Sequence, residues 1–277
     1  MKIIDIHIHP RHADLATASG REMADIMTGR MDRAGIAICG ILGTVQPYQD
    51  AASVRAGNDY TRETVAAAPD RLYGLCFANP LLSPAEVRDE LDRCLEQPEF
   101  RGIKLERDVN SRDARMEVVM EAAIRHNVPV LHHSWYVNTW TLDEAALHSQ
   151  AGRSEPHDIA ALARRFPEAK IVMAHLEGCG VRGILDVADL ENVWIDTSGA
   201  QPFTGTLEYA VATVGSSRIL YGSDLFGRGT ESQLGRILGT PLAPEDRDNI
   251  LYRNAEALYG LKAFDVPSAS TQPLLFQ

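Results

Sequence analysis

The sequence predicts an α/β protein in which strands and helices alternate along the whole chain. The first observation is the length of 277 residues, close to the roughly 250 residues typical of an eight-stranded α/β barrel. The second is the composition, 45% apolar and 23% charged, which is sufficient for a full hydrophobic core. The third is that short β-branched runs recur between segments that have the periodicity of helices.

Eight strand-like runs and eight helix-like segments follow one another in order. The strands are expected at Ile3–His9, Gly35–Leu42, Leu72–Ala78, Gly102–Leu105, Val128–Ser134, Lys170–His175, Val193–Thr197 and Arg218–Gly222. The helices are expected at Arg21–Ala34, Asn58–Ala68, Pro84–Leu95, Met116–His126, Pro156–Phe166, Gly180–Ala188, Leu207–Val214 and Glu245–Tyr259. The pattern repeats eight times, and the amino-acid composition does not change along the chain. Both observations favour a single closed (β/α)8 TIM barrel over an open doubly wound sheet.

The barrel is expected to form one domain, residues 1–262, followed by a short C-terminal tail, residues 263–277. The tail is rich in Pro and Ser before it turns apolar, so we expect it outside the core, either mobile or docked on a neighbouring subunit. Because the end of the tail is apolar, a contact between subunits of a homo-oligomer is one place where it could pack.

A long loop after the fifth strand carries Trp135, Tyr136 and Trp140. In a barrel this loop lies on the catalytic face. Its aromatic side chains therefore either line the substrate site or belong to a loop that simply packs against the protein.

Charge and composition exclude several classes of partner. The net charge of −11 and the lack of a basic run argue against nucleic acid. No run of eighteen apolar residues is present, which argues against a membrane span. The start of the chain lacks the pattern of a secretory signal, and the four cysteines are widely separated. We therefore expect a cytoplasmic protein with reduced thiols that acts on a small molecule.

The first strand carries two histidines at alternate positions, in the segment IDIHIH. Side-chain alternation predicts that its isoleucines face the helices, while Asp5, His7 and His9 face the barrel interior. Two inward imidazoles at i and i+2 can chelate one metal ion. The alternative is a pair of histidines satisfied by hydrogen bonds, which is less plausible for both at the end of one strand.

Other strands end in similar side chains. His132 and His133 end the fifth strand, although only one of them can point inward, while His175 ends the sixth strand and Asp224 the eighth. Three nitrogen donors and one carboxylate suit a zinc-like divalent ion with an open position for water. The sequence therefore predicts a metal centre at the carboxyl ends of the strands.

Several segments resemble the amidohydrolase superfamily, in its amidohydrolase-related (amidohydrolase 2) branch, over residues 3–261. That branch also contains carboxymuconate-semialdehyde decarboxylases and related lactonases. The resemblance rests on IDIHIHP (Ile4–Pro10), GIKL (Gly102–Leu105), VPVLHHS (Val128–Ser134), IVMAHLEG (Ile171–Gly178), VWIDTSG (Val193–Gly199), LYGSDLF (Leu220–Phe226) and NILYRNAEALYGL (Asn249–Leu261).

The resemblance implies roles for individual positions. His7 and His9 correspond to the metal ligands of the first strand, and the ligand of the fifth strand falls on His133, with His132 kept as the alternative. Asp224 corresponds to the residue that contacts the metal and relays the proton of the attacking water. His175 corresponds to a histidine that acts as acid or base, or binds a second ion.

Lys104, on the fourth strand, allows several interpretations. In some superfamily members a carbamylated lysine at this position bridges two metals, so Lys104 and His175 are candidates for a second ion. Alternatively, Lys104 pairs with a carboxylate such as Glu106, binds a substrate carboxylate, or forms a Schiff base. Glu106 and Glu177 depart from the family's usual histidine and glycine, respectively, and both add negative charge near the mouth.

The implied activity is hydrolysis of an amide, ester or lactone of a small molecule. A bound Zn, Mn or Fe ion, most simply a single one, would lower the pKa of its water from about 15.7 to about 7. Arg11, Lys104, Trp135 and Tyr136 are the candidates for substrate binding. The alternative on the same metal site is non-oxidative decarboxylation, and the third possibility is a metal-free binding or scaffold barrel.

Overall fold

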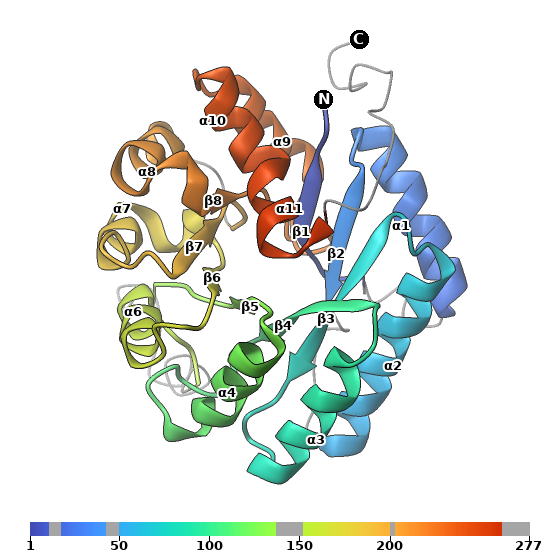
Figure 1. Cartoon of the computed structure of the whole chain (residues 1–277). Helices are drawn as coiled ribbons and strands as arrows, with labels where there is room; N and C mark the ends of the chain where they lie inside the picture. The colour runs from blue at the N-terminus through green and yellow to red at the C-terminus, as the bar shows by residue number, and fades with distance from the viewer. Residues whose placement is uncertain (11–17, 43–49, 137–151, 200–202, 262–277) are drawn as a thin grey trace, which may run out of the picture.

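The computed structural model describes residues 1–10, 18–42, 50–136, 152–199 and 203–261 of the chain. Eight parallel strands follow one another in sequence order around a single sheet, with the helices on its outside (Figure 1). The strands are β1 (Ile4–Ile8), β2 (Ile38–Leu42), β3 (Leu72–Ala78), β4 (Phe100–Leu105), β5 (Val130–His132), β6 (Ile171–Met173), β7 (Val193–Asp196) and β8 (Ile219–Leu220). The predicted (β/α)8 barrel is confirmed.

The described helices lie between and after these strands. They are α1 (Gly20–Ala34), α2 (Ala51–Ala67), α3 (Pro84–Leu95), α4 (Glu117–His126), α6 (Pro156–Arg165), α7 (Leu176–Asp186), α8 (Thr206–Val214), α9 (Thr230–Gly239), α10 (Pro244–Asp248) and α11 (Asn254–Leu258). None of them is long and apolar enough to cross a membrane. The four cysteines are free and buried, as expected.

Backbone hydrogen bonds beyond β8 join the last strand of the barrel to the first. The Ile6 N–H donates to the carbonyl of Tyr221 (3.1 Å), and the Asp224 N–H donates to the carbonyl of His7 (2.8 Å). The carboxylate of Asp5 adds to this seam, because its Oδ1 accepts from the N–H groups of His7 (3.2 Å) and Ser223 (3.0 Å). The seam thereby holds His7 of β1, and His9 just after it, next to Asp224.

Two apolar layers surround the strands. The outer layer lies between strands and helices and includes Met23, Met27 and Val87. The inner layer fills the barrel and is continued by side chains of α11 and the residues after it. Its members include Ile4, Ile6, Ile38, Leu75, Leu131, Val172, Leu220, Leu258 and Tyr259.

The predicted alternation along β1 is wrong for two of its isoleucines. Ile4 and Ile6 belong to the inner layer, whereas Ile8 belongs to the outer layer. The cause is a register irregularity between Asp5 and Ile8, where β1 has one residue more than the facing stretch of β2. An extra residue of this kind interrupts the alternation of a strand. The side chains of the neighbouring residues Ile6 and His7 therefore both face the barrel interior.

Most predicted elements match the structure, and the differences have local causes. β3 and α3 have the predicted bounds. α2 begins at Ala51, seven residues before the predicted start, because Asp50 caps it by accepting from the Ser53 N–H (2.8 Å). α9 was not predicted, since it begins after a glycine with no side-chain cap. The predicted helix at Glu245–Tyr259 is divided into α10, a π-helical segment (Asn249–Arg253) and α11.

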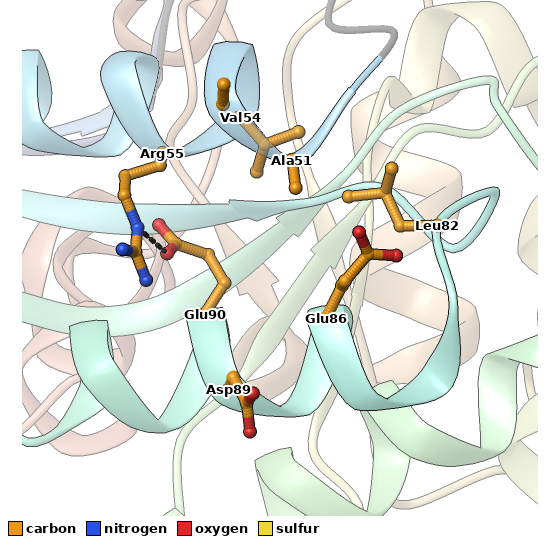
Figure 2. Close-up of a pocket in the computed structure, with 8 residues that line it drawn as sticks. Ala51, Val54, Arg55, Leu82, Glu86, Asp89 and Glu90 are labelled. Carbon is orange, nitrogen blue, oxygen red and sulfur yellow. Dashed lines mark hydrogen bonds and ion pairs between the residues drawn. The ribbon is translucent and has the colours of Figure 1, made fainter.

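A groove of about 340 Å³ lies between α2 and α3 on the outer surface (Figure 2). Arg55 of α2 reaches across it to Glu90 of α3, with 3.2 Å between Nε and Oε2. None of the described residues that line the groove is a histidine. The groove is therefore separate from the histidine-bearing strand ends.

The inner layer makes a direct prediction for stability. Leu131 is completely buried in the barrel, so Leu131→Ala should lower the free energy of unfolding by about 2–5 kcal/mol through lost burial and a residual cavity. Leu81, which is 56% exposed, provides the matched control. Leu81→Ala should change the free energy of unfolding by no more than about 0.5 kcal/mol. Urea unfolding followed by circular dichroism measures both; equal losses would contradict the assignment of Leu131 to the core.

Candidate metal centre

Three of the predicted ligands converge at the carboxyl end of the barrel. The Nε2 atoms of His7 and His9 are 3.3 Å apart, and Asp224 Oδ1 lies 3.4 Å from His9 Nε2 and 3.9 Å from His7 Nε2. Two nitrogens bound to one tetrahedral ion at about 2.1 Å are separated by about 3.4 Å. The three side chains therefore have the spacing of ligands around a single ion.

The hydrogen bonding of His7 also fits a metal. His7 Nδ1 donates to Asp196 Oδ2 over 2.6 Å, so Nε2 is the ring nitrogen directed into the site. A carboxylate behind a metal-binding histidine orients the ring in this way. His9 Nδ1 is buried and has no hydrogen-bond partner among the described residues. Burial lowers the pKa of His9 to about 3, so its imidazole is neutral, the form that binds metal.

Asp196 holds several parts of the site together. Its Oδ1 accepts from the N–H groups of His175 (3.0 Å) and Ser198 (2.8 Å), while its Oδ2 holds His7. Burial opposes ionisation of this carboxyl, but His7, His175 and Ser198 together lower the pKa of Asp196 below its usual range. His7, His175 and Asp196 form a second compact group, although two of its three members are already joined by the short hydrogen bond.

Two residues of the site have backbones in the left-handed region. His175 has φ 70° and Asp224 has φ 57°, conformations that side-chain-bearing residues seldom adopt. Each is held by a hydrogen bond of its own N–H, that of His175 to Asp196 and that of Asp224 to the carbonyl of His7. Such conformations persist where the surroundings fix them, and they aim both side chains at the strand ends.

The fifth strand directs His133, rather than His132, toward the site. His132 uses both ring nitrogens elsewhere, Nε2 with Ser111 Oγ (2.9 Å) and Nδ1 with the carbonyl of His133 (2.8 Å). His133 Nδ1 lies 3.1 Å from His175 Nε2, and its own Nε2 is buried without a partner in the described part of the chain. His133 is, however, outside the compact set of His7, His9 and Asp224.

Glu106 is a member of the site that was not among the candidate residues. Its Oε1 lies 3.1 Å from Lys104 Nζ and 3.8 Å from His9 Nε2, and its Oε2 lies 3.8 Å from His133 Nδ1. Burial opposes its ionisation, but Lys104, His9 and His7 together lower the pKa of Glu106 to about 2. Lys104, only 1% exposed, thus has the carboxylate partner that one interpretation of the sequence expected. The sequence could have indicated Glu106, because it follows Lys104 by two residues and alternation places both side chains on the same face of the strand.

The candidates for substrate binding differ in whether their side chains lie near the imidazoles. The Trp135 ring lies edge-on to the His175 ring, with 5.5 Å between the centres, and is therefore next to the predicted site. Tyr136 donates its hydroxyl hydrogen bond to Asp186, at the far end of α7, so this group is directed away from the imidazoles. Arg11 lies outside the described residues, as does the C-terminal tail.

Glu177, the second departure from the family pattern, has a structural partner. Its carboxylate forms a buried ion pair with Arg236 of α9 and accepts from the Phe203 N–H (3.1 Å). Arg236 also donates to the carbonyl of Thr197. Glu177 therefore connects α7 to α9 and to the segment after β7.

Known proteins are similar to this chain over most of its length. A model of the family described as Amidohydrolase matches residues 4–261. The chain belongs to the amidohydrolase family. A gamma-resorcylate decarboxylase of Polaromonas sp. is 25% identical over 258 residues, which cover 76% of each chain.

Solved structures share the fold of this protein. The 2,6-dihydroxybenzoate decarboxylase from Rhizobium superimposes with a TM-score of 0.73 at 19% identity, over 94% of this chain and 99% of that one. A dihydroxybenzoic acid decarboxylase from Polaromonas sp., solved with bound manganese and the inhibitor 2-nitroresorcinol, has a TM-score of 0.72 at 19% identity, over 94% and 97% of the two chains.

The contact between His7 and Asp196 predicts how metal affinity depends on a residue that need not touch the ion. Asp196→Asn weakens the acceptor behind His7, and we expect the Kd for Mn²⁺ to rise by about 10–100-fold. Asp186→Asn, which alters only the partner of Tyr136, is the control and should leave the Kd unchanged. Titration calorimetry measures both; an unchanged Kd for Asp196→Asn would contradict the role of this contact.

Proposed function

We propose that this member of the amidohydrolase family is a metal-dependent, non-oxidative decarboxylase of a small hydroxylated aromatic acid. The observation that carries the proposal is the compact set of His7, His9 and Asp224, in a chain that is similar to a gamma-resorcylate decarboxylase. A manganese ion in a decarboxylase of the same fold supports a divalent cofactor. Hydrolysis was the first expectation from the sequence, and the comparisons favour its alternative.

The donor set fits a single divalent ion. His7, His9 and Asp224 would hold it, and Glu106, whose Oε1 lies 3.8 Å from His9 Nε2, would be the neighbouring carboxylate. His133 stays the ligand that the sequence predicts after the fifth strand. When bound, such an ion would supply positive charge that holds the oxygen substituents of the substrate in a fixed orientation. Mixed nitrogen and oxygen donors suit manganese or iron as well as zinc.

Decarboxylation requires little redistribution of atoms. The bond between the ring carbon and the carboxylate breaks, CO₂ leaves, and a proton takes the vacated position on the ring. No electrons are gained or lost, so no oxidant or reductant is needed. A hydroxyl group beside the carboxylate favours the reaction, because its oxygen donates electron density to the ring carbon that receives the proton.

The residues of the chain supply the proton and the orientation. Asp224 Oδ1 lies beside the two imidazoles, so the second oxygen of this carboxylate can pass a proton to the ring carbon and recover it from water. The Trp135 ring offers an apolar face for an aromatic substrate beside His175. The Lys104–Glu106 pair leaves little net charge at the back of the site.

The proposal predicts the fate of the proton. The manganese-loaded protein, given 2,6-dihydroxybenzoate or 5-carboxyvanillate in D₂O, should release CO₂ and leave one deuterium on the vacated ring carbon, observed by NMR. Asp224→Asn should lower kcat by about 10²–10⁴-fold at saturating Mn²⁺, because it removes the proton carrier and weakens one ligand of the ion. The exposed Asp189→Asn is the control and should retain full activity.

A hydrolytic outcome would overturn the proposal. The same preparation should be tested on aromatic esters, amides and lactones. Turnover of any of these together with no release of CO₂ from the hydroxybenzoates would assign the site to hydrolysis.

A further inference from the structure

Three arginines lie at the carboxyl end of the barrel, outside the set of groups that would hold the ion. Arg107 comes two residues after β4, Arg153 three residues before α6, and Arg228 four residues after Asp224. Arg107 and Arg228 are exposed, and Arg153 is partly exposed. The three arginines are therefore on the side of the molecule from which a ligand reaches the histidines.

Backbone contacts bring two of these positions together. Gly152 packs so closely on the chain after β4 that a Cβ added to it would collide with the carbonyl of Arg107. The carbonyl of Ser154 accepts from the Trp135 N–H (3.2 Å). Because Arg153 lies between Gly152 and Ser154 in the sequence, its backbone runs between Arg107 and Trp135.

The Trp135 ring connects this pair to the third arginine. The guanidinium carbon of Arg228 lies 6.0 Å from the centre of the ring, and the centre of the His175 ring lies 5.5 Å from it. Arg107, Arg153 and Arg228 thus follow one another along one side of the candidate site. We call these three residues the arginine arc.

The positive charges of the arginine arc are not neutralised within the described part of the chain. The ion pairs found there join other arginines to carboxylates, such as Arg112 to Asp158, and none of them includes a member of the arc. Glu155, two residues after Arg153, lies beside His157, with 3.4 Å between Oε2 and Nδ1. Since 38 acidic side chains outnumber 27 basic ones in this protein, the arc is a local reversal of the overall charge.

The field of the arginine arc extends into the site. Burial, followed by the charge of the neighbouring Arg107, lowers the pKa of Arg153. Burial is also the main cause of the low pKa of His9 and of His133, and the charge of Arg107 contributes to both. The positive potential is therefore present both at the entrance and at the imidazoles that an incoming ligand meets.

Long-range electrostatics determines how an anion approaches such a protein. A net charge of −11 repels an anion, whereas unpaired cations around a cleft attract it and raise its association rate by about 10–10³-fold. Charges at the rim of a binding site act mainly on the association rate and on its dependence on salt. An anionic ligand of this protein therefore needs a local positive potential on its path to the metal centre.

We propose that the arginine arc captures anionic ligands and steers them to the metal centre, so that it sets their rate of association. The inference rests on the proposed function only in taking the natural substrate as an anion. The arc acts through its charge before the ligand is bound, and not through a directed contact in the bound state. Lysine at these three positions should therefore serve as well as arginine.

Two ligands of similar size and different charge test the arc by stopped-flow fluorescence. The probes are 4-nitrobenzoate, an anion, and 4-nitrobenzyl alcohol, which is neutral, and both quench tryptophan emission when they bind beside Trp135. With the manganese-loaded protein, the association rate constant of 4-nitrobenzoate should fall at least about 10-fold between about 0.01 M and about 1 M NaCl, because the Debye length shrinks from about 30 Å to about 3 Å. The rate constant of the alcohol should not change.

Two triple variants distinguish charge from directed contact. Arg107→Gln, Arg153→Gln and Arg228→Gln together should lower the rate constant of 4-nitrobenzoate about 10-fold at low salt and remove its salt dependence. The rate constant of 4-nitrobenzyl alcohol should stay the same, which also shows that the variant is folded. The corresponding lysine variant keeps the charge but not the paired donors of arginine, and it should retain the rate constant and its salt dependence.

Three arginines at the opposite end of the barrel provide the matched control. Arg33, Arg125 and Arg164 are exposed and lie in the last turns of α1, α4 and α6. Their replacement by glutamine changes the net charge by the same amount. At about 0.1 M NaCl, where the Debye length is about 10 Å, it should leave the rate constant of 4-nitrobenzoate unchanged, while the glutamine variant of the arc still lowers it.

The outcomes separate this inference from the proposed function. No association of 4-nitrobenzoate, a rate constant independent of salt, equal losses in the arc and control variants, or a loss in the lysine variant would each overturn the role of the arc, even if CO₂ is released from hydroxybenzoates. Association does not require cleavage of a carbon–carbon bond. A salt-dependent rate constant that is lost only in the glutamine variant of the arc therefore supports this role even if the decarboxylation assay fails.

Discussion

The hydrogen bond between His7 and Asp196 is the interaction on which the rest of the site depends. It joins the first strand to the seventh over 2.6 Å, and both side chains are completely buried. An ionised carboxylate in such a place is costly unless it is well paired, and Asp196 meets this condition with contacts to His7, His175 and Ser198. The same contacts determine which nitrogen of His7 is free, and they hold His175 in its left-handed conformation.

The closure of the barrel adds the remaining constraint. β1 has one extra residue relative to β2, and it pairs with the segment after β8 through the carbonyl of His7 and the N–H of Asp224. The imidazoles and the carboxylate are therefore fixed by backbone hydrogen bonds as well as by their own contacts. Groups held in this way need little reorganisation when an ion or a substrate binds, which is the condition for an effective catalytic site.

Local patterns in the sequence predict the barrel and much of the site. Periodicity identifies the alternating elements, and because the strands of a barrel end on one face, His7, His9 and Asp224 could be expected to meet. Features that depend on neighbouring strands could not be found in this way. The extra residue in β1 depends on its pairing with β2, and the contacts of His133 and Glu106 depend on how their strands lie beside one another. Likewise, only the packing of α7 directs the Tyr136 hydroxyl to Asp186.

The central claim is that one divalent ion binds between His7, His9 and Asp224, with Asp196 behind His7. The most direct test is a crystal structure of the manganese-loaded protein, with anomalous diffraction recorded above and below the manganese absorption edge. The account predicts one anomalous peak within about 2.0–2.3 Å of the two Nε2 atoms and of an Asp224 oxygen. A peak between His175 and Asp196, or no peak at saturating manganese, would contradict it.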